Sequence, residues 1–234
     1  VDALLARADR VVASSDYLCQ VKGRLAPRIH LVRHGVDAAR FGEGGAMPAD
    51  LAPFRRPRLG YFGALHKLDL DLCREMARRR PDWSFLFVGP VTGPQGADVG
   101  RLADVPNVRV LGPRPYEAMP AYLGSVDVAI MPFALTALTT AMSPIKVYEA
   151  LAAGKPVVST AVPELTHFGD LVRIAGDAEG FVTAVEACLR EPAHRGEERK
   201  RFAAENTWER RFAEIERLLS EALERRGRDV ARGR

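Results

Sequence analysis

Residues 143–159 read SPIKVYEALAAGKPVVS, a pattern that predicts a helix followed directly by a buried strand. Ser143 is a favourable N-cap residue, and Pro144 then stands at N1, where its missing N–H costs nothing. Gly154 is suited to the C′ position that ends the helix, and Pro156 prevents the helix from resuming. Both ends of the helix are therefore marked in the sequence.

Two charged residues on this helix predict a ligand. Lys146 stands at the expected N3 position, where a capping box would have Glu or Gln, and it meets the positive end of the helix dipole. A cation is favourable there when it shares an anion with the free backbone N–H groups, and phosphate is the usual anion. Glu149 lies three residues on, on the same face, where a carboxylate can hold sugar hydroxyls. The spacing alone leaves a surface Lys–Glu pair equally open.

The rest of the chain alternates short apolar runs with helical patterns. Most of the runs are apolar on both faces, which is typical of a parallel sheet covered by helices on both sides. The order of strands and helices predicts an α/β fold, a doubly wound, Rossmann-like parallel sheet. The predicted strands are residues 10–13, 29–32, 58–62, 84–88, 108–111, 126–131, 156–159 and 171–174.

We expect five segments along the chain. A strand–helix–strand unit cannot bury its own faces, so the first segment is expected to pack on the main domain, on a partner, or on a segment outside this sequence. The second is rich in Gly and Pro and is typical of a linker. The segments are the strand–helix–strand unit (1–41), the linker (42–57), the doubly wound domain (58–207), a last helix (208–228) and a basic tail (229–234).

The composition bounds the function. The 234 residues are 47% hydrophobic and 27% charged, which is ordinary for a globular chain of one large domain or two small ones. The net charge of +4 equals the charge of residues 225–234, where five arginines (225, 226, 228, 232 and 234) stand against Asp229, so the rest of the chain sums to zero. No aromatic stacking platform accompanies this charge, so nucleic acid is not an expected partner. Weak contact with an anionic membrane surface is kept as a hypothesis for the tail.

Other sequence features indicate a cytoplasmic protein, at most peripheral to the inner membrane. No run of about 18 apolar residues is present, and the first residues do not resemble a signal peptide. The absence of an initiator Met suggests a fragment. Cys19, Cys73 and Cys188 are far apart, as expected of buried thiols in a reducing compartment, and the five histidines form no ligand motif. We therefore expect no metal site.

The loops after the predicted strands are the candidate binding rim, because ligands of open parallel sheets bind outside the carboxyl ends of the strands. Gly63 permits close approach to the backbone, and His66 and Lys67 follow it as donors. Gly89 opens the turn 89–94, which ends the second strand of the domain.

Two further loops extend this rim. Residues 112–116 form a stiff loop around Arg114 whose backbone could contact a flat base, and residues 132–142 form a long loop rich in small and hydroxyl residues. Lys67, Arg114 and Lys146, with Glu149 beside them, suit a diphosphate next to a diol. No Ser-His-Asp order, P-loop or catalytic carboxylate pair is evident.

These motifs resemble a known family. Residues 142–158 are similar to the signature helix of bacterial nucleotide-sugar glycosyltransferases of the GT-B fold, group 1 and family 4-like. The similarity continues in order along the chain and covers nearly all of it. The other matching stretches are residues 8–15, 34–37 with Phe41, 60–63, 106–112, 125–133 and 207–208.

The resemblance implies a function for these residues. It implies transfer of a sugar, such as a hexose, from a nucleotide diphosphate sugar to a saccharide or lipid-linked acceptor, usually with retention and without a cofactor or essential metal. Lys146 would be catalytic by stabilising the leaving diphosphate, and Glu149 would hold the ribose. The donor would further contact Gly63, Lys67, Gly89, Arg114 (at the base), Ser143, Pro144 and Ile145.

The sequence departs from the family at two positions and in length. Ala141 stands where many relatives have a first Glu, and Ala64 stands where many have an Arg, for which Lys67 is a candidate substitute. Residues 1–41 resemble only the end of the family's acceptor domain, so we expect this chain alone to bind donor weakly and to transfer poorly. The expected pathway is envelope or capsular polysaccharide synthesis.

Two other functions stay open on the sequence. A nucleotide-sugar epimerase of the same fold would need acidic and His residues facing the sugar, and His66 is the candidate on this rim. A non-catalytic nucleotide-binding or assembly module is the other, with homodimer pairing through the surface that the acceptor domain would cover.

Overall fold

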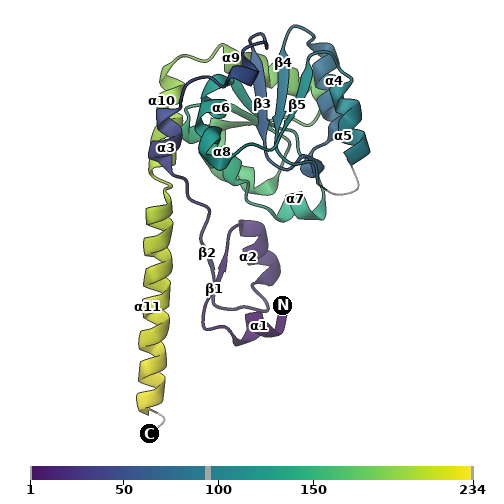
Figure 1. The fold of residues 1–234 in the computed structure, drawn as a ribbon. Coiled ribbons are helices and arrows are strands. Elements are labelled where there is room, and N and C mark those ends of the chain that lie inside the picture. The colour runs from purple at the N-terminus through teal and green to yellow at the C-terminus, as the bar shows by residue number, and fades with distance from the viewer. Residues whose placement is uncertain (1, 93–95, 233–234) are drawn as a thin grey trace.

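The computed structural model describes residues 2–92 and 96–232. A large α/β body carries a small unit of two strands on one side, and a long helix extends past that unit (Figure 1). The predicted fold class is confirmed, because the main sheet is parallel and helices lie on both of its faces.

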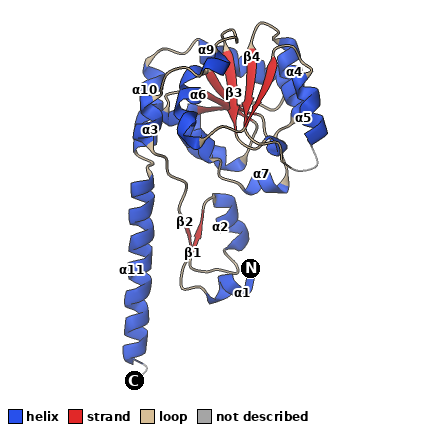
Figure 2. Cartoon of the chain, in the orientation of Figure 1, coloured by secondary structure: helices blue, strands red, loops and turns tan. Residues whose placement is uncertain are grey.

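Six parallel strands form the main sheet in the order β5-β4-β3-β6-β7-β8. Figure 2 draws the strands of this sheet in red among the helices that surround them. The chain runs outward from β3 to β5, then returns to the centre at β6, so β3 and β6 are neighbours. Loops leaving two such strands diverge and open a crevice at the carboxyl edge of the sheet. The strands are β3 (Arg58–Phe62), β4 (Ser84–Val88), β5 (Val108–Gly112), β6 (Val128–Met131), β7 (Val157–Ser159) and β8 (Val172–Ile174).

Helices cover both faces of this sheet. On one face α4 (Leu70–Arg79) contacts α5 (Gly96–Ala103) and α9 (Ala178–Leu189). On the other face α8 contacts both α3 and α10, and α3 also contacts α6. The elements of this second layer are α3 (Ala38–Glu43), α6 (Met119–Ser125), α8 (Ile145–Ala152) and α10 (His194–Ala204).

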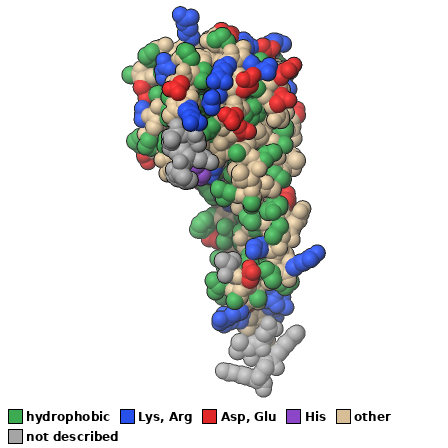
Figure 3. All heavy atoms as spheres, turned by 90° about the vertical axis from the view of Figure 1, so that its right-hand side faces the viewer, with side chains coloured by type: hydrophobic (Ala, Val, Ile, Leu, Met, Phe, Trp, Pro, Cys, Tyr) green, Lys and Arg blue, Asp and Glu red, His purple; other side chains and the backbone are tan. Residues whose placement is uncertain are grey.

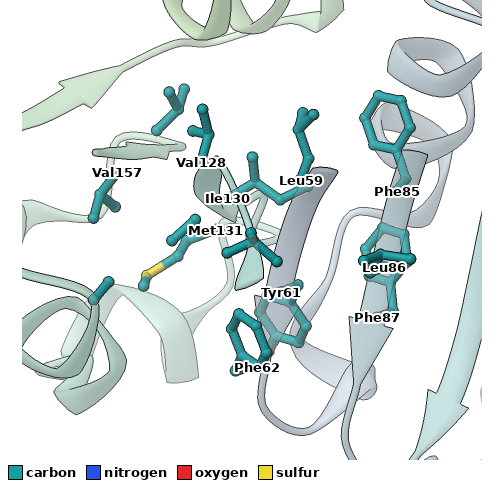
Figure 4. Close-up of a cluster of buried hydrophobic side chains, with 14 of the residues drawn as sticks. Leu59, Tyr61, Phe62, Phe85, Leu86, Phe87, Val128, Ile130, Met131 and Val157 are labelled. Carbon is teal, nitrogen blue, oxygen red and sulfur yellow. The ribbon is translucent and has the colours of Figure 1, made fainter. Parts of the chain in front are cut away.

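The core lies between these layers (Figure 4). Every residue of β3 and β4 is buried, as expected for parallel strands covered on both sides. Leu59, Tyr61, Phe85 and Phe87 are among the side chains that fill the space around the two strands. Each such burial contributes about 1.5–3 kcal/mol relative to an exposed side chain, which makes this sheet a rigid support for its loops.

The small unit has the predicted strand–helix–strand order. Its strands β1 (Val11–Ala13) and β2 (Ile29–Leu31) pair in parallel, with α2 (Asp16–Lys22) between them and α1 (Asp2–Arg7) before them. α2 contacts α7 (Ala137–Ala141), the helix that follows β6. The unit therefore packs against the carboxyl edge of the main sheet.

The expected linker, residues 42–57, is not a bare connection. α3 continues to Glu43, and the short 3₁₀ turn η1 (Ala49–Leu51) follows it. Phe41 and Leu51 are both fully buried in the main core. The Gly- and Pro-rich composition is typical of a linker, but Leu51 within the segment, and Phe41 directly before it, anchor it to the large body.

The last helix, α11, runs from Trp208 to Arg232, past the boundary expected at residue 228. The predicted basic tail is therefore helical up to Arg232, and residues 233–234 lie outside the described part. Trp208, Phe212, Leu219 and Leu223 expose apolar side chains on this helix.

Acidic and basic side chains are mixed over the face of the body in Figure 3, without a patch of one sign. No helix among the described residues is long and apolar enough to cross a membrane.

Candidate functional site

The signature helix α8 begins one residue later than predicted. Pro144 is the N-cap, with φ −79° and ψ 100°, and it offers no side-chain cap. Ser143 therefore lies one residue before the cap, and Lys146 stands at N2 rather than N3. The prediction that Ser143 caps the helix is wrong, because extended backbone at Pro144 moves the first helical residue to Ile145.

The N-terminus of α8 has unused hydrogen-bonding groups. The Ser143 hydroxyl is buried and has no partner among the described residues. The backbone N–H of Val147 bonds to the Pro144 carbonyl at 3.1 Å, while those of Ile145 and Lys146 donate to no described group. A hydroxyl and two N–H groups at the positive end of a helix dipole are suited to an oxyanion.

Lys146 and Glu149 form a close pair beside this end of the helix. The Lys146 Nζ lies 2.7 Å from Oε2 and 3.0 Å from Oε1 of Glu149. The pair is not an ordinary surface pair, because Glu149 is only 1% exposed. Burial raises the pKa of Glu149, and the neighbouring Lys146 and a hydrogen bond from Tyr116 oppose that rise.

Tyr116 is a site residue that the sequence reasoning missed. Its hydroxyl donates to Glu149 Oε1 at 3.3 Å, and Lys146 Nζ lies 5.2 Å from the centre of its ring. Burial, and then the nearby Glu149 carboxylate, raise the pKa of Tyr116 to about 12, so the phenol stays protonated as a donor. The one available signal was an aromatic residue at the end of the stiff loop 112–116.

The ring of Tyr116 is held in place by α3. Phe41 packs edge-on against it at 5.9 Å between ring centres, and the Arg40 guanidinium lies 5.1 Å from its centre. The segment read as the end of the small unit and a linker thus contributes to one wall of the site.

Arg114, which the sequence places at the binding rim, already forms contacts within the protein. Its guanidinium pairs with Asp50 of η1 at 2.9 Å and donates to the Tyr122 hydroxyl at 2.8 Å. The Tyr122 hydroxyl also donates to Asp50. Burial raises the pKa of Asp50, but the hydrogen bonds from Tyr122 and Arg114 hold that pKa below its usual value. Asp50 therefore already balances the charge of Arg114.

Gly63 and Gly89 pack directly against each other at the carboxyl ends of β3 and β4. A Cβ at residue 89 would lie 1.9 Å from the Gly63 carbonyl oxygen, so only glycine fits there. The Gly63 N–H bonds to the Val88 carbonyl, and the Gly89 N–H bonds to the Gly112 carbonyl. The three loops therefore leave the sheet as one packed layer.

Lys67 and His66 lie on the loop after β3. The Lys67 carbonyl accepts from the Ala134 N–H, which joins this loop to the one after β6 at the crevice. His66 Nδ1 lies 2.7 Å from Thr92 Oγ1. Residues 93–94 of the predicted 89–94 turn lie outside the described part.

Metal ligands and a surface groove are the other candidates for a site. Within the described residues, no group of three or more His, Cys, Asp or Glu side chains is placed to hold a metal ion. A groove of about 960 Å³ lies along the edge strand β8, between α9 and the start of α10. It contains none of the predicted site residues.

The chain is similar to known glycosyltransferases. It is 35% identical over 167 residues to a protein of Bacillus subtilis (strain 168) provisionally named as a teichuronic acid biosynthesis glycosyltransferase, TuaH, covering 68% of this chain and 42% of that protein. The Anabaena protein HepE, solved with UDP and glucose, aligns with a TM-score of 0.75 at 18% identity, over 93% of this chain and 65% of that one.

Other solved structures share the fold. AviGT4, a glycosyltransferase of avilamycin A biosynthesis, aligns with a TM-score of 0.67 at 19% identity, over 91% of this chain and 64% of that one. The chain thus spans less than two thirds of the length of these relatives.

Residues 56–191 match the family profile described as "Glycosyl transferases group 1". The matched segment contains the main sheet, α8 and every predicted site residue. Because the match extends over more than half of the sequence, the chain belongs to the group 1 glycosyltransferase family.

Proposed function

We propose that this chain binds a nucleoside diphosphate sugar at the N-terminus of α8 and forms the donor half of a glycosyltransferase. The observation that carries the proposal is the group of Ser143, Lys146 and Glu149, with a buried free hydroxyl, a cation and a buried carboxylate within two turns. The diphosphate takes the hydroxyl, the two free N–H groups and the Lys146 ammonium, and the ribose takes Glu149. The fixed dipole and cation stabilise the diphosphate as it leaves.

The relatives support this assignment and its setting. HepE was solved with UDP, and the B. subtilis relative is provisionally placed in teichuronic acid synthesis. We therefore propose cell-envelope polysaccharide synthesis, from the cytoplasmic side of the membrane, with a saccharide or lipid-linked acceptor. Retention of configuration and independence of metal are part of the proposal.

The acceptor side of the cleft belongs to the same proposal. The small unit abuts the carboxyl edge through Ser15, whose hydroxyl donates to the Ala141 carbonyl at 3.0 Å. Among the described residues the small unit has two short strands, and α2 is its helix that contacts α7, which together offer little surface to hold an acceptor. We expect this chain alone to bind nucleotide weakly and to transfer sugar poorly, and steady turnover by the 234-residue chain would contradict this part.

Calorimetric titration with UDP and GDP tests the nucleotide site. Lys146→Ala and Glu149→Ala are each expected to weaken binding of the preferred nucleotide by about tenfold or more, because hydrogen bonds to charged groups are worth about 1.5–3 kcal/mol. Binding is expected to be the same with EDTA and with added Mg²⁺. Loss of binding in EDTA would contradict the metal-independent form of the proposal.

Lys200 and Glu197 supply a matched control. They form a pair of the same spacing, at 3.0 Å, but on an exposed helix face. Lys200→Ala is expected to leave nucleotide binding unchanged. Equal binding by wild type, Lys146→Ala and Glu149→Ala would refute the site, whatever the control shows.

A further inference from the structure

The Glu149 carboxylate has two donors in this structure, and one of them has a second task. Lys146 contacts both oxygens, and Tyr116 contacts Oε1. In the proposed function the Lys146 ammonium must turn to the diphosphate. When it does, the buried Glu149 loses its nearest cation.

A buried carboxylate without donors is costly, by about 1–3 kcal/mol for a lost partner and more for a charged group. The donors left to Glu149 are the Tyr116 hydroxyl and the incoming ribose hydroxyls. The ribose hydroxyls can donate to Glu149 only if its carboxylate stays ionised and keeps its orientation. A fixed second donor to the carboxylate would keep it so.

Tyr116 and Lys146 differ in their freedom to move. The Tyr116 ring is held between Phe41 and Arg40 of α3, so its hydroxyl keeps its place on Glu149. Lys146 has four side-chain rotations, whereas Tyr116, although 41% exposed, has two and packs its ring on Phe41 and Arg40. The lysine is the mobile donor and the tyrosine is the fixed one.

We propose that Tyr116 is a positioning residue that holds the Glu149 carboxylate toward the ribose while Lys146 moves to the diphosphate. This inference rests on the proposed nucleotide site. Tyr116 thereby sets the preference of the site for a nucleotide that has both ribose hydroxyls.

Titrations with UDP and GDP and with their 2′,3′-dideoxy counterparts test this role. Wild type is expected to bind the better ribonucleotide at least tenfold more tightly than its dideoxy form. Tyr116→Phe keeps the ring against Phe41 and removes only the hydroxyl. It is expected to reduce that preference about fivefold, the value of one hydrogen bond, while binding of the dideoxy form stays within about twofold.

Two further readouts separate positioning from a structural role. In a Glu149→Ala background, Tyr116→Phe is expected to cause no further loss of preference, because the oxygen that accepts from the Tyr116 hydroxyl is gone. In the Tyr116→Phe variant alone, the acidic limb of the binding profile is expected to move to higher pH, since a hydrogen bond that lowers the pKa of Glu149 is removed. Tyr17→Phe, in α2 of the small unit, is the matched control and is expected to change neither readout.

Each outcome has one meaning. An unchanged preference in Tyr116→Phe, or an equal loss for ribose and dideoxy forms, overturns the role of Tyr116 alone. Wild-type binding without ribose preference overturns it too, since Glu149 would not face the ribose. Wild type that binds none of the four nucleotides refutes the proposed function itself.

Discussion

At the residue scale, the site contains charged side chains whose positions are unfavourable for the stability of the fold. Lys146 stands at the positive end of a helix dipole, and Glu149 is a carboxylate buried almost completely. Departures from the usual placement of charged residues are expected at functional sites. Both residues stand out in the sequence, because the wrong-signed charge and the three-residue spacing are visible in it.

Tyr116 could not be found in the same way. Its contact with Glu149 joins residues 33 positions apart, and its ring is fixed by Phe41, a further 75 positions from it. Such partners depend on how α3 packs, which no local pattern records. The contact of Arg114 with Asp50 could not be seen for the same reason, because the two residues lie 64 positions apart.

The cost of the buried carboxylate gives a pH-dependent prediction. Burial raises the pKa of Glu149 in the folded chain, so the stability carried by the protonated form is lost as the pH rises through that pKa. Glu149→Gln is therefore expected to be more stable than wild type at pH 7, and the difference is expected to shrink at about pH 4. Urea unfolding at both pH values measures this. A difference independent of pH would show that ionisation of Glu149 does not destabilise the fold.

The packing of Gly89 against Gly63 gives a second prediction. Gly89→Ala places a Cβ on the Gly63 carbonyl, and the overlap is expected to lower the free energy of unfolding by about 3 kcal/mol. Gly176→Ala meets no atom within 4 Å and is expected to be neutral or slightly stabilising. Denaturant curves of both variants compare them, and similar values would remove the steric argument.

At the element scale, the strands were predicted closely and the connections less well. Runs that are apolar on both faces marked β3, β4 and β6, because the period of a buried parallel strand is local to the sequence. The end of α8 was also predicted, since Gly154 adopts φ +70° and the N–H groups of Gly154 and Lys155 bond back to the last turn. Its start was not, because Ser143 and Pro144 are both common near helix N-termini.

α3 is the element whose role was missed. Residues 42–57 were read as a linker from their Gly and Pro content, whereas Leu51 within this segment, and Phe41 directly before it, are buried in the core. Phe41→Ala is expected to lower the free energy of unfolding by about 3–5 kcal/mol, because the side chain is fully buried. Phe212→Ala, which removes a mostly exposed ring from α11, is expected to cost far less. Equal effects in urea unfolding would mean that Phe41 does not anchor α3 to the core.

At the scale of the whole molecule, one buried carboxylate joins the small unit to the large body. Glu164 in η4 (Pro163–Leu171) accepts from Arg33 at 2.6 Å and from the Asp16 N–H at 2.9 Å. Its side chain is only 2% exposed. The ion pair therefore fixes the small unit at the edge of the sheet where the site lies.

Loss of this contact is expected to destabilise the molecule. Arg33→Gln leaves Glu164 buried without its cation and is expected to cost about 3 kcal/mol in the free energy of unfolding. The control is Arg79→Gln, which breaks an exposed pair with Glu75 and is expected to cost less than about 0.5 kcal/mol. Comparable values for the two variants would mean that the small unit gains nothing from Glu164.

The location of the nucleotide site is the central claim, and amide chemical shifts test it residue by residue. During a titration with UDP or GDP, the largest shifts are expected at Ile145 and Lys146, followed by Gly63 and Gly89. The groove along β8 is the alternative binding site, because it is a broad hollow and β8 lies at the opposite edge of the sheet from β5. Shifts centred on residues 172–174 and 180, with Ile145 and Lys146 unchanged, would contradict the account.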